Sequence, residues 1–381
     1  MNVILCSSDN NRFSGAFLCL VELCKYLLQK TDIKVKVLLP CEGSGTQLLE
    51  RENIPYVTIR SYPWIVPLHG TVLSTLKAFC KCVLNIIAVL RIAKYVICND
   101  IDIIHCNSTW TFVGIVAARL CRKKSIWHLR EVMWLSQDLK PFLPFSVAKS
   151  LYSNITIGIA VSQYVKKIYY DKYGEFNITC IYDGVDVSRF YMPHRSILQY
   201  DPVQILMVNA IYPGKGQAEL LCAISKLPLE FQKRIVVTFV GDNQVDKDYT
   251  NKLYHIIQAE GLQIQVRFVG AVKDVESYYG SSDISVICSR FEAFGRATIE
   301  SMLSGNIVIG CNSGATKEII KDKETGMLYV SGNTQSLADK ISFCLQHPGL
   351  SNQIADFGRR AALQYSVENN GKAMTRLYKE L

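Results

Sequence analysis

The sequence lacks the features that would place it among nucleic-acid-binding or repeat proteins. Its 381 residues carry a net charge of +9, yet lysine and arginine are spread thinly. There is no basic block and no zinc-finger spacing, so a nucleic acid is not the expected partner. No internal repeat or low-complexity segment is visible. The positive charge is then better explained by a phosphorylated substrate or an anionic membrane surface.

The cysteines lack the spacing of a metal site. Fourteen are scattered through predicted strands and helices, and the closest pair, Cys80 and Cys82, has no second pair to complete a site. A chain of this length does not need disulfides, so we expect buried free thiols in a reducing cytoplasm. The first residues have no charged segment typical of a signal peptide. The expected location is the cytoplasm, with the inner face of the cytoplasmic membrane as the alternative.

Long uncharged runs are also missing. The segment Val72–Ile97 is rich in apolar residues but is interrupted by lysine and arginine side chains. Its longest uncharged run, Cys82–Leu90, is about half of what a bilayer requires. Two interpretations stay open: an amphipathic helix packed on a sheet, or a helix resting on an anionic membrane.

What is present is an alternation of strand-like and helix-like segments from end to end. This alternation predicts an α/β fold with doubly wound parallel sheets, and the length allows two domains. We predict a first domain over residues 1–191, a polar linker over 192–202 and a second domain over 203–365. Residues 366–381 are expected to form a helix that packs back on the first domain. The predicted strands are Asn2–Cys6, Lys34–Leu39, Pro55–Ile59, Asp102–His105, Ser125–Leu129, Thr156–Val161, Ile178–Tyr182, Val203–Val208, Ile235–Val240, Val266–Gly270, Ile284–Cys288, Ile307–Gly310 and Gly326–Val330.

The stretch after the predicted strand Ile284–Cys288 carries the strongest chemical signal. Gly295 lies where this strand gives way to a helix over Arg296–Ser304, and a helix N-terminus presents N–H groups and a positive dipole end to an anion. Glu292 precedes the turn, and Glu300 follows it by eight residues and lies within the helix. This arrangement suits a ligand with phosphate in the middle and hydroxyls at both ends, such as a nucleotide sugar.

Three strings resemble one known family. The run from Ser289 to Gly305 resembles the E-x7-E segment of family-4 retaining glycosyltransferases, the "group 1" enzymes of GT-B architecture. Pro213-Gly214-Lys215-Gly216-Gln217 resembles their K-G element, and Asp183-Gly184-Val185-Asp186 resembles their N-G-V-D turn with Asp183 in place of asparagine. The resemblance implies two Rossmann-like parallel-sheet domains that face each other across a cleft.

The resemblance also implies roles in the second domain. Lys215 is expected to contact the diphosphate of the donor, with Gly295 and Arg296 beside it. Glu292 is expected to face the sugar ring and to be catalytic. Glu300 would accept hydrogen bonds from the ribose hydroxyls, and the base would lie near Val269 and Gly270.

In the first domain, Gly15 resembles the glycine whose loop approaches the phosphate and acceptor. His128 resembles the strand-end histidine of the family and is the second expected catalytic residue, able to bind a sugar hydroxyl or orient the acceptor. Arg130 and Glu131 are possible acceptor contacts. His105 is expected to be a structural cap rather than a direct contact. The acceptor-side loops are expected at Ser61–Gly70 and Trp134–Pro144.

One departure from the family pattern concerns the phosphate. The family commonly carries an arginine five residues before the lysine, where this chain has Ala210. Arg296 is the candidate replacement, and an exposed helix-start arginine is the competing interpretation. No metal and no cofactor are expected, because neither D-x-D string, Asp100–Asp102 or Asp246–Asp248, is placed to bridge phosphates to Mg²⁺.

The implied activity is a metal-independent retaining hexosyl transfer from a UDP-sugar to a saccharide or lipid-linked acceptor, in the synthesis of a surface polysaccharide or glycoconjugate. A nucleotide-sugar epimerase on the same scaffold is one alternative, but it should carry further acids and histidines that are not evident. An inactive sugar-nucleotide-binding subunit is the other. The loss of arginine at Ala210 favours that subunit slightly. The residues that count against it are His128, Lys215, Glu292 and Glu300.

Overall fold

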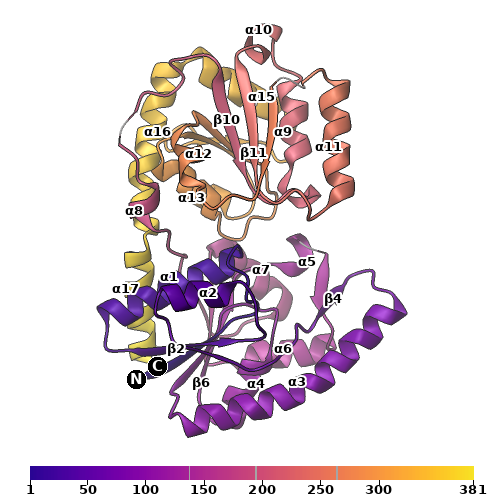
Figure 1. Ribbon diagram of the computed structural model, residues 1–381, viewed down its shortest axis with the longest axis vertical. Coiled ribbons are helices and arrows are strands. Elements are labelled where there is room, and N and C mark those ends of the chain that lie inside the picture. The colour runs from indigo at the N-terminus through magenta and orange to yellow at the C-terminus, as the bar shows by residue number, and fades with distance from the viewer. Residues whose placement is uncertain (137, 194, 263–264) are drawn as a thin grey trace. The chain divides into compact units, whose positions relative to one another are not determined.

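The computed structural model describes residues 1–136, 138–193, 195–262 and 265–381. His194, within the predicted linker 192–202, and Gln137, within the predicted loop Trp134–Pro144, lie outside the described residues. The chain forms two compact units (Figure 1). Unit 1 comprises Met1–Gly184 and Val367–Leu381, and unit 2 comprises Val185–Ser366.

Unit 1 is built on a parallel sheet. Among the described residues it has seven strands in the order β3-β2-β1-β5-β6-β8-β9. The strands are β1 (Asn2–Cys6), β2 (Lys34–Leu39), β3 (Tyr56–Thr58), β5 (Ile103–Cys106), β6 (Lys124–Leu129), β8 (Ile157–Ala160) and β9 (Ile178–Cys180). Two short strands, β4 (Ile65–Pro67) and β7 (Leu139–Pro141), pair antiparallel outside this sheet. This pairing joins the two loops that the sequence assigns to the acceptor side.

Helices cover both faces of the unit 1 sheet, as strands buried on both faces require. Val3, Leu5 and Ile103 pack toward α1, while Gly114 of α4 lies against the alternate residues Ile104 and Cys106. The helices of this unit are α1 (Gly15–Lys30), α2 (Gly45–Arg51), α3 (Val72–Cys98), α4 (Val113–Leu120), α5 (Met133–Ser136), α6 (Phe145–Ser153), α7 (Gln163–Tyr173) and α17 (Val367–Glu380).

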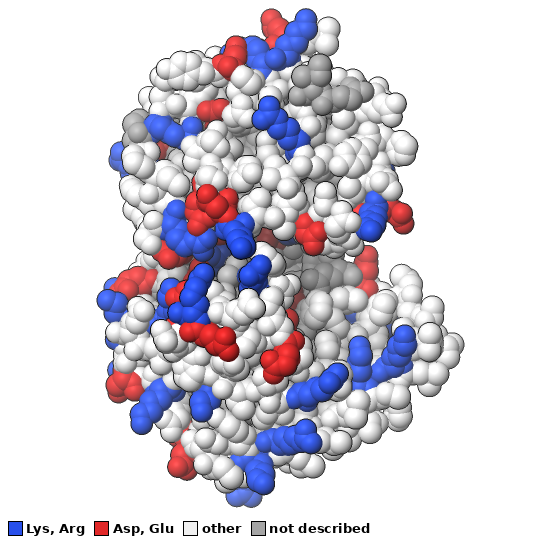
Figure 2. Space-filling model, viewed as in Figure 1, with Lys and Arg blue, Asp and Glu red and all other residues white. Residues whose placement is uncertain are grey.

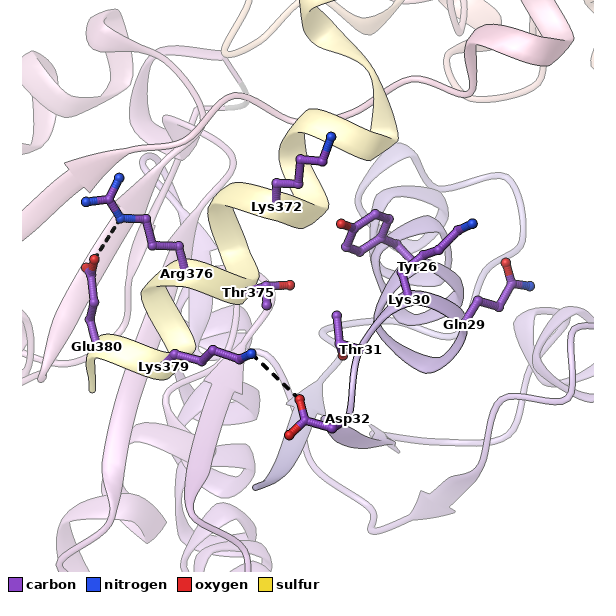
Figure 3. A pocket seen from close by; sticks show the side chains of 10 residues that line it. All are labelled: Tyr26, Gln29, Lys30, Thr31, Asp32, Lys372, Thr375, Arg376, Lys379 and Glu380. Atoms are coloured by element: carbon purple, nitrogen blue, oxygen red, sulfur yellow. Dashed lines mark hydrogen bonds and ion pairs between the residues drawn. The ribbon is translucent and has the colours of Figure 1, made fainter.

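The C-terminal helix α17 lies on α1, far from it in sequence. Met374, Leu377 and Tyr378 enter the core formed by α1 and the sheet. Gly371 permits this approach, because a Cβ at that position would come within 2.1 Å of the Tyr26 ring. Figure 3 shows the groove that remains between the two helices, with Lys379 of α17 reaching toward Asp32 at an Nζ–Oδ1 distance of 3.8 Å.

Unit 2 is built on a second parallel sheet, with six strands in the described residues in the order β12-β11-β10-β13-β14-β15. These are β10 (Val203–Val208), β11 (Ile235–Val240), β12 (Val266–Gly270), β13 (Ile284–Ile287), β14 (Ile307–Cys311) and β15 (Met327–Tyr329). The helices are α8 (Val187–Phe190), η1 (Pro213–Lys215), α9 (Gln217–Ile224), α10 (Leu229–Gln232), α11 (Lys247–Ala259), α12 (Glu276–Gly280), α13 (Arg296–Leu303), α14 (Thr316–Ile319), α15 (Thr334–Gln346), α16 (Pro348–Ala362) and η2 (Leu363–Tyr365).

The prediction of two Rossmann-like parallel-sheet domains is therefore confirmed. In such sheets ligands bind beyond the carboxyl ends of the strands. In unit 2 this edge carries the turn after β10 and the loop after β13, and these two strands are neighbours in the sheet. In unit 1 it carries the ends of β5, β6 and β9 and the start of α1.

Candidate functional site

The loop after β13 enters α13 through Gly295. This residue is the N-cap of α13 and has φ +98°, a conformation that favours glycine. A side chain there would also approach Ile319 and Thr298, whose nearest atoms lie 3.1 and 3.2 Å from an added Cβ. Glycine at this position therefore lets the backbone turn from the loop into the N-terminus of α13, whose N–H groups can bind an anion.

Lys215 and Glu292 come together at this edge. Lys215 ends the short helix η1 after β10, and its Nζ lies 3.2 Å from Oε2 of Glu292. Burial by itself lowers the pKa of Lys215, but the charge of Glu292 and the hydrogen bond to it outweigh burial, so the pKa is raised. Lys215 therefore remains a cation beside a carboxylate.

Gly216 explains why the turn after β10 can reach the loop after β13. It adopts φ +78°, and an added Cβ would lie 2.6 Å from Cβ of Cys288, the residue after β13. Any larger residue would push the two segments apart. The glycine of the K-G element therefore brings the preceding lysine close to the Glu292 loop.

A second loop fixes the backbone of Glu292. The N–H of Ala315 donates to the carbonyl oxygen of Glu292 at 2.8 Å. Gly314, with φ +58°, lies so close that an added Cβ would be 2.7 Å from the same carbonyl oxygen. The position of Glu292 is thus determined by packing on both sides.

Glu300 is 8% exposed and each of its carboxylate oxygens has a partner. Oε1 accepts a hydrogen bond from Nε of Arg296 at 2.8 Å, and Oε2 accepts one from the hydroxyl of Tyr279 at 3.1 Å. Burial and the charge of Glu300 raise the pKa of Tyr279 well above its usual value, so the phenol stays a donor.

Tyr279 was missed by the sequence analysis, because nothing in the sequence near α12 marks it. Arg296, expected at the phosphate, is engaged with Glu300 four residues on; its phosphate role stays a prediction. At the position of the missing family arginine, the carbonyl oxygen of Ala210 accepts a hydrogen bond from Nε2 of Gln217 at 3.0 Å.

Val269 and Gly270, expected near the base, end strand β12. They lie at the same sheet edge as Lys215, but β11 separates β12 from β10. Gly270 has φ +81° and open space around it. Their role also stays a prediction.

In unit 1, His105 and His128 lie on the neighbouring strands β5 and β6. Their rings stack with centroids 5.2 Å apart, and both side chains are fully buried. Burial and the charge of Arg130 lower the pKa of His105 to about 3. The same two causes, together with His105, hold the pKa of His128 well below its usual value. Both rings are therefore neutral near pH 7.

Arg130 and Glu131, expected as loose acceptor contacts, are held inside unit 1. Arg130 forms an ion pair with Asp183, the residue that replaces the family asparagine, and donates from Nε to Oδ1 of Asn107 at 3.0 Å. Oε1 of Glu131 accepts hydrogen bonds from the side chains of Ser108 and Thr109 and from the backbone of Thr109. Burial raises the pKa of Glu131. Their acceptor role stays a prediction.

Gly15 begins α1, directly after the N-cap Ser14. It is exposed, and an added Cβ would meet no atom within 4 Å. The space beside it is therefore open in unit 1, as an approach by a ligand would require.

No group of three or more His, Cys, Asp or Glu side chains is arranged to hold a metal ion in the part of the chain that the structure describes. Asp102 of the first D-x-D string accepts a hydrogen bond from the backbone N–H of Asn2 at 2.8 Å, at the amino end of the sheet. The expected freedom from metals and cofactors stays a prediction.

Two family models match the chain. The model described as Glycosyltransferase Family 4 matches residues 13–189, and the model described as Glycosyl transferases group 1 matches residues 194–361. The chain belongs to the group 1, family-4 glycosyltransferases.

Individual relatives of this glycosyltransferase are distant. An uncharacterized glycosyltransferase of Methanocaldococcus jannaschii is 26% identical over 77% of this chain and 77% of the relative. A lipopolysaccharide core biosynthesis mannosyltransferase of Rhizobium leguminosarum is 27% identical over 35% of this chain and 38% of its own. The crystal structure of Anabaena HepE in complex with UDP has a TM-score of 0.82 with 22% identity and full coverage of both chains, which shows the same fold.

The neutral histidine pair makes the stability of unit 1 depend on pH. The unfolded chain takes up protons on both histidines below a pH of about 6.5, whereas the folded chain does not until far lower pH. The free energy of unfolding should therefore fall as the pH drops, by up to about 1.4 kcal/mol per pH unit for each histidine. All four tryptophans lie in unit 1, so denaturant unfolding followed by tryptophan fluorescence between pH 7 and 4 measures this slope.

His105→Gln removes one of the two titrating histidines. The free energy of unfolding should therefore fall less steeply with decreasing pH, by the contribution of one histidine. Val21→Ala, a core change in the same unit that keeps both histidines, should lower the curve at every pH without changing its slope. An equal slope in wild type and His105→Gln would contradict the neutral state of this ring.

Proposed function

We propose that this glycosyltransferase moves a hexose from a UDP-sugar to a saccharide or lipid-linked acceptor, with retention of configuration at the transferred carbon. The observation that carries this proposal is the arrangement at the edge of the unit 2 sheet. There the Lys215 ammonium lies 3.2 Å from the Glu292 carboxylate beside the N-terminus of α13, and Glu300 lies further along the same helix. The UDP and UDP-glucose complexes of HepE, a protein of the same fold, support a uridine donor.

The charges at this edge suit a leaving diphosphate. In the transfer, the bond from the sugar carbon to the diphosphate oxygen breaks and negative charge builds on the phosphate. Lys215 offers a fixed positive charge, and the start of α13 offers N–H groups and a positive dipole end. We propose that these groups replace a metal ion. The ammonium then shifts its hydrogen bond from Glu292 toward the phosphate, which frees Glu292 to face the sugar.

The other groups position the two ends of the donor. Arg296 and Tyr279 hold the Glu300 carboxylate in place, and a carboxylate is the acceptor that ribose hydroxyls need. The acceptor hydroxyl attacks the sugar carbon on the face that the diphosphate leaves, and its proton passes to the leaving phosphate oxygen. The Rhizobium relative is named for lipopolysaccharide core biosynthesis, which supports a glycoconjugate acceptor.

Glu292→Gln tests this assignment. Turnover with UDP-hexoses should fall at least about a hundredfold, as for loss of one charge-stabilising group. UDP affinity should stay equal or increase, because Lys215 loses its competing carboxylate. Calorimetry with UDP and a product assay in the presence of a chelator measure both, and NMR of the product gives the anomeric configuration.

Glu260→Gln, which changes an exposed carboxylate after α11 in the same unit, is the matched control and should keep wild-type turnover. If wild type binds UDP but transfers no sugar, the inactive-subunit alternative replaces the proposal. If it binds no UDP, the assignment of a UDP-sugar site to unit 2 is wrong.

Helix α3 exposes an unusually large apolar surface. One helix in the described residues, Val72–Cys98, is long and apolar enough by length and composition to cross a membrane. Only 22% of its 18-residue apolar stretch is buried in the protein. The side that packs on the protein is narrow: small residues such as Ala88 face inward, and Asn85 exchanges hydrogen bonds with the backbone of Tyr62. Its apolar side chains that are at least 44% exposed are Val72, Leu73, Leu76, Phe79, Val83, Leu84, Ile86, Ile87, Leu90 and Ile97.

We propose that α3 lies along an anionic membrane surface, so that the protein is a peripheral membrane protein on the cytoplasmic side. The helix has no acidic residue, and its four basic residues are all exposed: Lys77, Lys81, Arg91 and Lys94. Figure 2 shows Lys and Arg atoms interspersed with uncharged atoms along the edge of unit 1 where α3 runs in Figure 1. Apolar side chains between basic ones fit the boundary between acyl chains and anionic headgroups. Because α3 is held lengthwise against α4 and β4, it would lie in the interface and not across the bilayer.

Vesicle sedimentation tests this contact. Wild type should bind vesicles with 30% phosphatidylglycerol at least about tenfold more strongly than neutral vesicles, and 0.5 M NaCl should weaken the binding. Leu76→Glu with Ile87→Glu should abolish binding without loss of stability, since both side chains are exposed.

Leu229→Glu, at an exposed apolar position in unit 2, is the control and should bind vesicles like wild type. Equal binding by the α3 variant would contradict the contact. A wild-type dimer in solution that this variant dissociates would instead identify α3 as a protein interface.

A further inference from the structure

The loop between β1 and α1 carries an arginine without a charged partner. Nε of Arg12 is buried and has no hydrogen-bond partner, and no ion pair or hydrogen bond involves this side chain among the residues that the structure describes. Its guanidinium lies over the ring of Phe13, with Cζ 4.8 Å from the ring centroid. A buried donor without an acceptor is costly. The unpaired guanidinium therefore points to an anionic ligand.

This loop lies where the strand order of the unit 1 sheet reverses. From β1 the chain passes to β2 and β3 on one side and returns to β5 on the other, so β1 and β5 are neighbours at the reversal. In sheets of this kind ligands bind beyond the carboxyl ends of the strands at such a reversal. Arg12 and Phe13 follow the carboxyl end of β1 and precede Gly15, beside which the space is open. The unpaired donor thus lies where the fold favours a ligand.

The backbone of this loop is held by the loop after β2. The N–H of Arg12 donates to Oγ of Ser44 at 3.2 Å. The buried Asn10 donates from Nδ2 to the carbonyl oxygen of Cys41 at 2.9 Å. Gly43 permits this packing, because an added Cβ there would lie 2.2 Å from the carbonyl oxygen of Asn10. The backbone of Arg12 is therefore fixed before a ligand binds, which lowers the entropic cost of binding.

The one acid of this loop, Asp9, does not neutralise Arg12. Its Oδ1 accepts a hydrogen bond from the N–H of Asn11 at 3.0 Å, and its Oδ2 accepts one from the hydroxyl of Ser14 at 3.0 Å. The carboxylate of Asp9 thus stabilises the turn into α1. A guanidinium keeps its proton in proteins, and its planar fork matches two oxygens of a carboxylate or a phosphate.

Phe13 adds an apolar surface next to this cation. Its ring is 54% exposed, and its backbone N–H donates to Oδ1 of Asn11 at 3.0 Å. An aromatic ring offers a large flat surface, on which the C–H face of a sugar ring can stack. A small inorganic anion would use only the charge of Arg12. A sugar that carries an anionic group would use both side chains.

We infer that Arg12 and Phe13 form a subsite of unit 1 for an acidic sugar residue, in which Arg12 binds the carboxylate or phosphate oxygens and the Phe13 ring stacks on the sugar. That this sugar belongs to the acceptor rests on the proposed function. The binding of an acidic sugar rests on the geometry of unit 1 alone. Arg12 and Phe13 then select an anionic acceptor over a neutral one and take no part in the bond that forms.

The experiment observes Arg12 directly. In ¹H–¹⁵N spectra of ¹⁵N-arginine-labelled protein, the Nε–H signal that disappears in Arg12→Gln belongs to Arg12. Glucuronate, galacturonate or glucose 6-phosphate should shift this signal, whereas glucose and galactose should not. Stronger binding of a uronate identifies a carboxylate ligand, stronger binding of glucose 6-phosphate identifies a phosphate ligand, and both support the subsite. No shift with any of the three acidic sugars would overturn the inference.

Phe13→Leu removes the ring and keeps the charge. The Kd of the acidic sugar should rise about fivefold, as for the loss of one aromatic contact, and the Kd of inorganic phosphate should stay the same. An unchanged Kd of the acidic sugar, or an equal rise for both ligands, would overturn the stacking role. Arg119→Gln, at an exposed arginine of α4 in the same unit, is the control and should bind the acidic sugar like wild type.

Transfer assays separate this inference from the proposed function. The acceptors are phenyl glycosides of the acidic sugar that binds and of its neutral counterpart. In wild type kcat/KM should be at least about tenfold higher for the acidic acceptor, as for one hydrogen bond to a charged group, and Arg12→Gln should lose this preference. Equal values in wild type would overturn the acceptor role while sugar transfer stands. An Arg12 signal that responds to acidic sugars, in a protein that transfers no sugar from any UDP-hexose, would support the subsite and reject the proposed function.

Discussion

The 3.2 Å contact between Lys215 and Glu292 exists because two neighbouring parallel strands, β10 and β13, end at the same edge of a sheet. The contact also depends on Gly216, since an added Cβ there would collide with Cys288. A bulky residue at that position would separate the ammonium from the carboxylate without touching either. Glu300, one helix turn after Arg296, is likewise held by its neighbours, because Arg296 and Tyr279 both donate hydrogen bonds to its carboxylate. The proposed donor site of unit 2 thus depends on the sheet edge and its packing as much as on its charged groups.

Unit 1 is organised differently. Its charged residues at the strand ends are paired within the unit. Arg130 forms an ion pair with Asp183. Glu131 accepts hydrogen bonds from Ser108 and Thr109. Burial and the charge of Arg130 in turn lower the pKa of both histidines and keep them neutral. Nε2 of His128 is a buried polar atom without a hydrogen-bond partner in the described part of the chain.

Local pattern explains what the sequence could predict. The alternation of apolar runs with helical periods predicted both sheets, and the strand, Gly295 and helix order placed Glu292 and Glu300 correctly on a loop and a helix. The sequence also allows the Arg296–Glu300 pair to be predicted, because residues four apart share a helix face. The sequence interpretation assigns this arginine to the phosphate instead. Tyr279 and Tyr378 could not be predicted, since they meet Glu300 and His105 only through tertiary packing. The β4–β7 pairing was missed because three-residue strands leave no periodicity to detect.

The central claim is that the edge formed by Lys215, Glu292 and the start of α13 holds a nucleoside diphosphate. Hydrogen–deuterium exchange of the whole chain, measured with and without saturating UDP, tests it most directly. The account predicts slower amide exchange in residues 213–217 and 292–300, with unchanged exchange in α3. Protection confined to other segments of the chain, with residues 213–217 and 292–300 unaffected, would contradict it.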